Sequence, residues 1–212
     1  MASTRSAIEV EIRGAVERAD YKVAATLALD AYGSEVQRFL RARLRDSTQA
    51  DDAYLTFSED LWVGLPAFRW ESSLRVWLFT LARNAATRMG RRRHKEVALS
   101  TERGLPVDAL AAGARTATVS YLRTSVKDRM RELRQRLDDD EQTLLILRVD
   151  RRLEWRELAV VMNEVHADAT EEQLTRASAR MRTRFQVAKR KLRTLAQAAG
   201  LLDSSTRGDR GE

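Results

Sequence analysis

Apolar residues recur at intervals of three and four along most of the chain, which is the period of an amphipathic helix. The pattern is clearest in three series: Leu27, Ala31, Val36, Phe39, Leu40, Leu44; Leu74, Trp77, Leu78, Leu81; and Leu144, Leu145, Leu147. The alternation of β-branched residues that marks a strand is absent. The pattern therefore predicts an all-α fold.

Glycine and proline occupy few positions, and these positions divide the chain. The only prolines are Pro66 and Pro106, and neither residue type occurs between Gly113 and Gly200. The stretch 96–125 contains Pro106, Gly113 and many small residues, which is typical of a flexible linker. We predict a helical domain over residues 1–95, the linker over 96–125, a second helical domain over 126–200 and a disordered polar tail over 201–212.

The second domain shows the order of a helix-turn-helix, in which a short helix and a turn precede a basic recognition helix. The periodicity predicts helices over Asp139–Val149 and Trp155–Asn163. A third helix is expected to begin near Thr170, because Thr170 and Gln173 have the spacing of a capping box. Its basic face would enter the major groove of duplex DNA.

Positive charge is concentrated in two segments. The chain has a net charge of +7 and an isoelectric point near 10.2. Residues 67–95 hold eight basic residues and one acidic residue, and residues 173–193 hold eight basic residues and no acidic one. A single basic run is usually a solvated helix face. Two such helical segments, each behind an apolar face, favour binding of nucleic acid.

The sequence also excludes several classes of function. It has no cysteine, so disulfides and thiolate-bound metals are impossible. No apolar run approaches the roughly 20 residues of a membrane span, and the N-terminus lacks the apolar core of a signal peptide. His166 and Asp168 are too few for a metal site, and phosphate-binding-loop, H-E-x-x-H and G-x-S-x-G motifs are absent. We expect no catalytic residue, no cofactor, no metal and no enzyme activity, and a cytoplasmic location without membrane insertion.

The segment FRWESSLRVWLFTLARNAATRMGRRRHK, residues 68–95, resembles the second conserved region of bacterial RNA polymerase sigma factors of the extracytoplasmic-function (ECF) group. Upstream, Ala50–Asp52 and Leu61–Trp62 are similar to the acidic helix by which that family docks on the polymerase. Downstream, LEWRELAVVMN at 153–163 and ARMRTRFQVAKRKLR at 179–193 are similar to its helix-turn-helix.

The resemblance implies two DNA-reading units on one polymerase subunit. The first domain would bind core RNA polymerase, recognise the minus-ten promoter element and open it. The second domain would read the minus-thirty-five element as duplex DNA. Many members of the group are held by an anti-sigma factor, so such a partner is possible here. The acidic residues expected to contact polymerase are Asp51, Asp52, Glu59 and Asp60.

The chemistry of residues 68–95 supports that division of tasks. The loop Phe68–Ser73, here named the base-capture loop, offers aromatic rings, hydroxyls and a carboxylate for an unstacked base. Asn84 can form two hydrogen bonds with adenine, and the arginine cluster suits phosphate. Trp70 stands where the family usually has glycine; it either stacks on a flipped base or packs on Phe68. The expected DNA contacts are Phe68, Trp70, Glu71, Ser72, Arg83, Asn84, Arg88, Arg91, Arg92, Arg93 and Lys95.

The second domain offers a further set of basic contacts for duplex DNA. These are Arg176, Arg180, Arg182, Arg184, Lys189 and Arg190. The stretch 165–178 is longer than the family's tight turn, so either the turn is expanded or the recognition helix begins early, at Thr170. Trp62 and Trp77 are expected in the hydrophobic core.

Two other functions compete with a sigma factor. A stand-alone helix-turn-helix regulator would bind duplex DNA and ignore polymerase, but it leaves the motif at 68–95 unexplained. A helical RNA-binding or adaptor protein would bind without regard to promoter sequence. Polymerase binding separates these alternatives.

Overall fold

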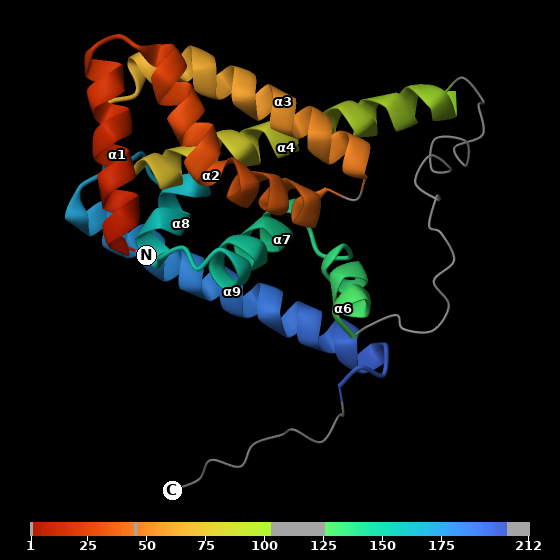
Figure 1. Cartoon of the computed structure of the whole chain (residues 1–212). Helices are drawn as coiled ribbons and strands as arrows, with labels where there is room; N and C mark the ends of the chain where they lie inside the picture. The colour runs from red at the N-terminus through yellow and green to blue at the C-terminus, as the bar shows by residue number, and fades with distance from the viewer. Residues whose placement is uncertain (1, 45, 103–125, 203–212) are drawn as a thin grey trace, which may run out of the picture.

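The computed structural model describes residues 2–44, 46–102 and 126–202, and every regular element in these ranges is helical (Figure 1). The predicted all-α fold is confirmed. The residues 103–125 of the expected linker and 203–212 of the expected tail lie outside the described residues. The elements are α1 (Ala2–Glu17), α2 (Tyr21–Arg43), α3 (Ser47–Gly64), η1 (Leu65–Ala67), α4 (Leu74–Glu102), α6 (Val126–Arg134), α7 (Asp139–Leu145), η3 (Ile146–Asp150), α8 (Trp155–Val161) and α9 (Glu171–Ala198).

Aspartate side chains fix where three of these helices begin. The carboxylate of Asp20 accepts a hydrogen bond from a backbone N–H in the first turn of α2, at 3.2 Å. Asp46 does the same for α3 at 2.9 Å and Asp138 for α7 at 2.8 Å. The first N–H groups of a helix have no partner within the helix, so each aspartate satisfies one that would otherwise remain unpaired.

Helices α1–α4 form the N-terminal unit, and close packing of rings and small residues holds them together. The rings of Phe39 on α2 and Phe79 on α4 meet edge to face, with centroids 5.6 Å apart. A Cβ atom added to Gly33 would lie 2.5 Å from the hydroxyl of Tyr54, so α2 and α3 cross too closely there for a larger residue unless Tyr54 moves. Helix α4 continues to Glu102, beyond the residue where the first domain was expected to end.

Helices α6–α9 form the C-terminal unit, and α8, a turn and α9 follow each other in the predicted order. The Thr170 hydroxyl accepts a hydrogen bond from the N–H of Gln173, and the Gln173 side chain accepts one from the N–H of Thr170. The predicted capping box is therefore present. It starts α9 directly after Thr170, so this helix begins early, as one of the two alternatives predicted. Residues 162–170 form the connection, here named the α8–α9 turn.

The two units are packed against each other. Helices α7 and α8 lie between the α1–α4 bundle and the long helix α9 (Figure 1), and α8 contacts both α4 and α9. One cluster of buried apolar side chains runs through both units, from Ile12 on α1 to Ala188 on α9. Among the described helices, none is long and apolar enough to cross a membrane.

Candidate nucleic-acid interface

The base-capture loop is held by a stack of aromatic rings. Phe68 lies flat on Trp77 of α4, with ring centroids 4.4 Å apart and an angle of 16° between the planes. Trp70 also contacts Phe68, with ring centroids 4.8 Å apart and the planes tilted by 50°. The hydroxyl of Ser73 accepts a hydrogen bond from the N–H of Val76 and so ends the loop where α4 begins. The loop is thus fixed on the first turns of α4.

Trp70 has a left-handed backbone conformation, with φ of 60°. An L-residue with a bulky side chain rarely adopts this region, whereas glycine does so freely. Its ring is half-buried between Phe68 and the guanidinium of Arg13 on α1, which lies 5.6 Å from the ring centroid. Of the two roles expected for Trp70, the structure shows packing on Phe68, and base stacking stays a prediction.

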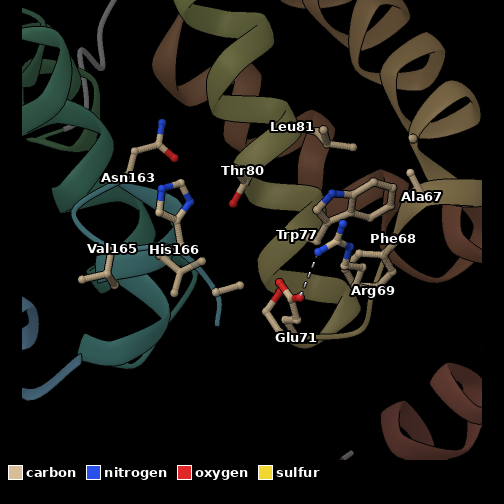
Figure 2. Close-up of a pocket in the computed structure, with 14 residues that line it drawn as sticks. Ala67, Phe68, Arg69, Glu71, Trp77, Thr80, Leu81, Asn163, Val165 and His166 are labelled. Atoms are coloured by element: carbon tan, nitrogen blue, oxygen red, sulfur yellow. Dashed lines mark ion pairs between the residues drawn. The ribbon is translucent and has the colours of Figure 1, made fainter. Parts of the chain in front are cut away.

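A cavity of about 470 Å³ opens between the base-capture loop and the C-terminal unit. Figure 2 shows Phe68, Arg69, Glu71 and Trp77 on one side, and Asn163 and His166 of the α8–α9 turn on the other. Glu71 faces Arg69 at 4.0 Å (Figure 2). Ser72 also lines this cavity, and its hydroxyl donates to the carbonyl of Ser73 at 3.3 Å.

The predicted readers on α4 differ in how accessible they are. Arg83 is only 15% exposed, and its guanidinium donates to Asp140 of α7 at 3.0 Å. Arg88 pairs with Asp60 of α3. Asn84 is half-buried, whereas Arg91 and Arg92 are exposed. Arg93 and Lys95 belong to the same helix, but their side chains lie outside the described ones.

The predicted duplex contacts all lie on α9, and several are engaged by carboxylates. Arg180 and Arg184 both bind Glu164 of the α8–α9 turn, at 3.1 and 2.5 Å. Arg176 pairs with Glu172 one helical turn away. Arg182 lies over the ring of Trp155 and Lys189 over that of Phe185, each 5.8 Å from the centroid, and Arg190 is exposed.

Asp140 joins the two sets of predicted DNA contacts. One of its oxygens accepts from Arg83 of α4, and the other accepts from Arg184 of α9 at 3.1 Å. Burial by itself raises the pKa of the Asp140 carboxyl, but the hydrogen bonds and charges of the two arginines outweigh it, so the pKa lies below the ordinary value. The carboxylate is therefore ionised at neutral pH.

Sequence reasoning missed two further arginines that reach across the units. Arg43 at the end of α2 is 7% exposed; it donates to the Thr143 hydroxyl at 3.0 Å and pairs with Asp139 at 2.7 Å. Arg75 on α4 pairs with Glu35 of α2 and donates to the carbonyl of Arg151 at 2.7 Å. Their partners lie up to 100 positions away, so no local pattern marks them.

The predicted docking helix α3 combines acidic and apolar exposed residues. Asp51 pairs with Arg41 at 3.3 Å and Asp60 pairs with Arg88, whereas Asp52 and Glu59 are exposed. The prediction that Trp62 lies in the core is wrong, because Trp62 is 50% exposed. Leu55 and Val63, on the same face of α3, are exposed at 63% and 75%. Trp77, by contrast, is half-buried and packs on the core.

Leu61 and Trp62 are adjacent apolar residues, and taken alone either could face inward. Ala53, Phe57 and Leu61 are all buried at intervals of four. A residue after Leu61 points about 100° further round the helix, toward solvent. An unbroken series of inward positions is thus the signal that places Trp62 outside.

Comparison with known proteins finds a family match for one segment and a similar fold for most of the chain. Residues 28–96 match the family model of sigma-70 region 2. The fold is similar to that of the sigma factor RpoE from Bartonella quintana, solved in complex with the anti-sigma factor NepR, with a TM-score of 0.58 and 20% sequence identity over 84% of this chain and 97% of that one. No curated protein sequence gives a significant match.

Proposed function

We propose that this chain, whose residues 28–96 match the family model of sigma-70 region 2, is a dissociable subunit of RNA polymerase that directs promoter recognition and strand opening. The match of residues 28–96 to sigma-70 region 2 and the fold shared with a sigma factor over 84% of the chain support the resemblance of the sequence to a sigma factor of the ECF group. The region 2 match carries the proposal, because it covers α3, the base-capture loop and most of α4. If the chain were a stand-alone helix-turn-helix regulator, the segment that matches region 2, residues 28–96, would have no function.

Core polymerase would dock on the exposed face of α3. Asp52 and Glu59 supply negative charge there, and Leu55 and Trp62 supply an apolar centre. Interfaces commonly place large apolar side chains at the centre and charges at the rim, where the charges guide association. The partner surface on the polymerase would therefore carry apolar side chains flanked by basic ones.

Strand opening would use the base-capture loop and α4. Extrusion of a base costs a few kcal/mol, which stacking and hydrogen bonds to the free base must offset. The loop offers Phe68, which contacts both Trp70 and Trp77 of α4, and the Glu71 carboxylate beside a cavity of about 470 Å³. Asn84 would read adenine, and the exposed Arg91 and Arg92 would bind phosphates.

The C-terminal unit would read the minus-thirty-five element through α9. The basic side chains of α9 come after a helix start that a capping box fixes. Helix α8 packs against α9, as the first helix of a helix-turn-helix packs against the second. The domain division at residues 1–95, 96–125 and 126–200 is part of this proposal. By analogy with the RpoE–NepR complex, an anti-sigma factor is a proposed partner, and the cytoplasm is the proposed location.

The decisive experiment mixes the purified chain with core RNA polymerase and a library of genomic promoter fragments. We expect a stable complex with core and transcripts that start at defined sites only when the chain is present. If the chain forms no complex with core RNA polymerase, the proposed function is contradicted.

Three variants separate the tasks of the residues. Trp62→Ala should weaken core binding while leaving the free energy of unfolding nearly unchanged, because the indole is half-exposed.

Asn84→Ala should lose sequence preference in the minus-ten element with core binding intact. Arg91→Ala should weaken DNA binding uniformly and reduce the slope of log affinity against log salt by about one unit. An unchanged slope would show that Arg91 does not contact phosphate.

A further inference from the structure

Helix α1 lies beside the base-capture loop, although it precedes the segment that matches sigma-70 region 2, residues 28–96. Ile12 and Ala15 of this helix are fully buried, and the hydroxyl of Tyr32 on α2 donates to the carboxylate of Glu9 at 3.0 Å. These contacts fix α1 on α2 within the N-terminal unit (Figure 1). A side chain of α1 that reaches the loop therefore has a defined position there.

Arg13 is the side chain of α1 that reaches the base-capture loop. Its guanidinium carbon lies 5.6 Å from the centroid of the Trp70 ring. The attraction between a cation and a ring face uses the charge of the guanidinium and none of its N–H donors. Arg13 thus holds a positive charge beside an aromatic ring and keeps N–H groups for an anion.

The carboxylate that Arg13 binds is a weak competitor for such an anion. Within the described part of the chain its acidic partner is Glu17, which accepts from Nε at 3.2 Å. The two side chains are 58% and 66% exposed, so water and salt screen the pair. A phosphate could replace this carboxylate at little cost, because it binds the guanidinium with the same paired geometry.

A ring and a cation side by side match the chemistry of one nucleotide of a single strand. Proteins that bind single-stranded DNA stack its bases on aromatic side chains and bind its backbone with positive charge. Trp70 is half-buried, so part of its indole is open to solvent beside the guanidinium. The bases of a duplex are stacked inside it, so a base reaches an indole only from an unstacked strand.

We propose that Arg13 forms a phosphate subsite for single-stranded DNA, next to a base that contacts Trp70. The contact between the base and Trp70 rests on the proposed function, which includes strand opening. The guanidinium of Arg13 binds the neighbouring phosphate through its N–H groups. The DNA-binding surface therefore extends from α4 and the base-capture loop onto α1.

Two departures from the family pattern meet at this subsite. Trp70 stands where the family usually has glycine, and Arg13 precedes the matched segment. A glycine at position 70 would offer no ring, and the cation on α1 would have no aromatic partner. The subsite is thus a feature that this chain adds to the matched segment.

Four variants test the subsite. Arg13→Met removes the charge and keeps a long side chain beside Trp70, whereas Arg13→Lys keeps a charge. Trp70→Gly removes the ring, and glycine adopts the left-handed backbone without strain. Arg18→Met is the matched control, because Arg18 is exposed directly after α1 and its loss removes the same charge. Urea unfolding confirms that each variant is folded.

The measured quantity is the slope of log affinity against log salt. The probes are a short fluorescein-labelled single strand of mixed sequence and a duplex of the same sequence. Each is titrated at several salt concentrations with the chain alone and with the chain mixed with core RNA polymerase. A phosphate contact to a single strand contributes about 0.7 to this slope, because it releases counterions. A purely structural role of Arg13 would not change the number of ions released.

We expect Arg13→Met to reduce the single-strand slope by about 0.7 and to lower affinity about fivefold at low salt. Arg13→Lys should keep the slope, since the charge remains. Trp70→Gly should lower single-strand affinity about tenfold without changing the slope, because it removes stacking and no charge. Arg18→Met should leave the slope unchanged, and Arg13→Met should leave the duplex slope unchanged.

Three outcomes contradict the subsite. The first is a single-strand slope that Arg13→Met leaves unchanged both with and without polymerase. The second is an equal decrease of the slope in Arg18→Met, which would show an effect of total charge alone. The third is a wild-type chain that binds the single strand in neither form.

The experiment with core polymerase keeps this result separate from the proposed function. If the single-strand slope depends on Arg13 while no chain binds core, the phosphate subsite stands and the sigma role fails. If the wild-type chain directs transcription while the slope does not depend on Arg13, the sigma role stands and the phosphate subsite fails.

Discussion

Trp70 is a bulky residue in a backbone conformation that favours glycine. Its φ of 60° places it in the left-handed region, at the tip of the base-capture loop. Such strain persists only where the surroundings fix the residue, and here the ring contacts Phe68 and the guanidinium of Arg13. The aromatic contacts of the ring therefore offset the cost of the backbone at a position central to the proposed strand opening.

A pair of substitutions separates the ring from the backbone. Trp70→Ala and Trp70→Gly both remove the indole, but only glycine adopts the left-handed region without strain. We expect the glycine variant to be the more stable of the two by about 1 kcal/mol in urea unfolding. Equal stabilities would mean that the loop relaxes when the ring is gone.

Asp140 should make the free energy of unfolding depend on pH, and its lowered pKa gives the direction of that dependence. Its pKa in the folded chain lies below the ordinary value because Arg83 and Arg184 outweigh the effect of burial. A lowered pKa stabilises the folded chain above the unfolded-state pKa of about 3.9, and this stabilisation is lost as pH falls through the folded-state pKa. The free energy difference between wild type and Asp140→Asn should be constant from about pH 8 to 5 and shrink below about pH 4. A difference that already declines between pH 7 and 5 would contradict this assignment.

Helix α9 illustrates how local capping positions a functional element. The Thr170–Gln173 capping box fixes its first residue, and the basic face follows at defined rotations from that point. Because the box is local in sequence, the early start of this helix could be predicted before the structure was known.

The cap can be tested against a second threonine of the same helix. Thr170→Ala should lower the free energy of unfolding by about 1 kcal/mol, since one N–H of the first turn loses its acceptor. Thr183 lies mid-helix, and its hydroxyl bonds only the carbonyl of Ala179 one turn earlier. Thr183→Ala should therefore be neutral or slightly stabilising, because alanine has the higher helix propensity. A loss of stability in both variants alike would argue against a special role of the cap.

Helix α3 shows the limit of a pattern read along one element. The sequence predicts that its acidic residues form a docking face, yet Asp51 and Asp60 are engaged within the molecule by Arg41 and Arg88. The exposed indole of Trp62 takes part in that face instead of the core. Interface centres are enriched in tryptophan, which is why Trp62 becomes the first residue to test for polymerase binding.

The whole molecule places both proposed DNA surfaces against one acidic turn, the first turn of α7. Asp140 is partly exposed, at 46%, so its pairs are open to screening by salt. At about 1 M salt the Debye length is only about 3 Å. If the pairs help to hold the units together, the radius of gyration measured by small-angle X-ray scattering should rise with salt in the wild-type chain.

The Asp140→Asn variant is the control for this salt effect. It lacks the shared carboxylate, so it should be more expanded at low salt and should respond less to added salt. A wild-type radius that stays constant up to about 1 M salt would show that apolar contacts alone hold the two units together.

The sequence by itself determined everything that depends on near neighbours. Apolar spacing predicted the helices, the Thr170–Gln173 spacing predicted the start of α9, and the motif at 68–95 predicted the match to sigma-70 region 2. These signals are local because a helix forms its hydrogen bonds and its faces within a few residues.

Only the tertiary structure decided which charges meet. Arg83 and Asp140 lie 57 positions apart, and Arg43 and Thr143 lie 100 positions apart. The spacing of residues within one helix therefore indicates neither pair. The packing of Trp70 on Phe68 and beside Arg13 of α1 likewise depends on the tertiary structure. An arginine has the same sequence signature whether a phosphate or a carboxylate binds it, because both partners satisfy the same guanidinium. The fold alone brings the acidic turn of α7 to the arginines that we expect to bind DNA.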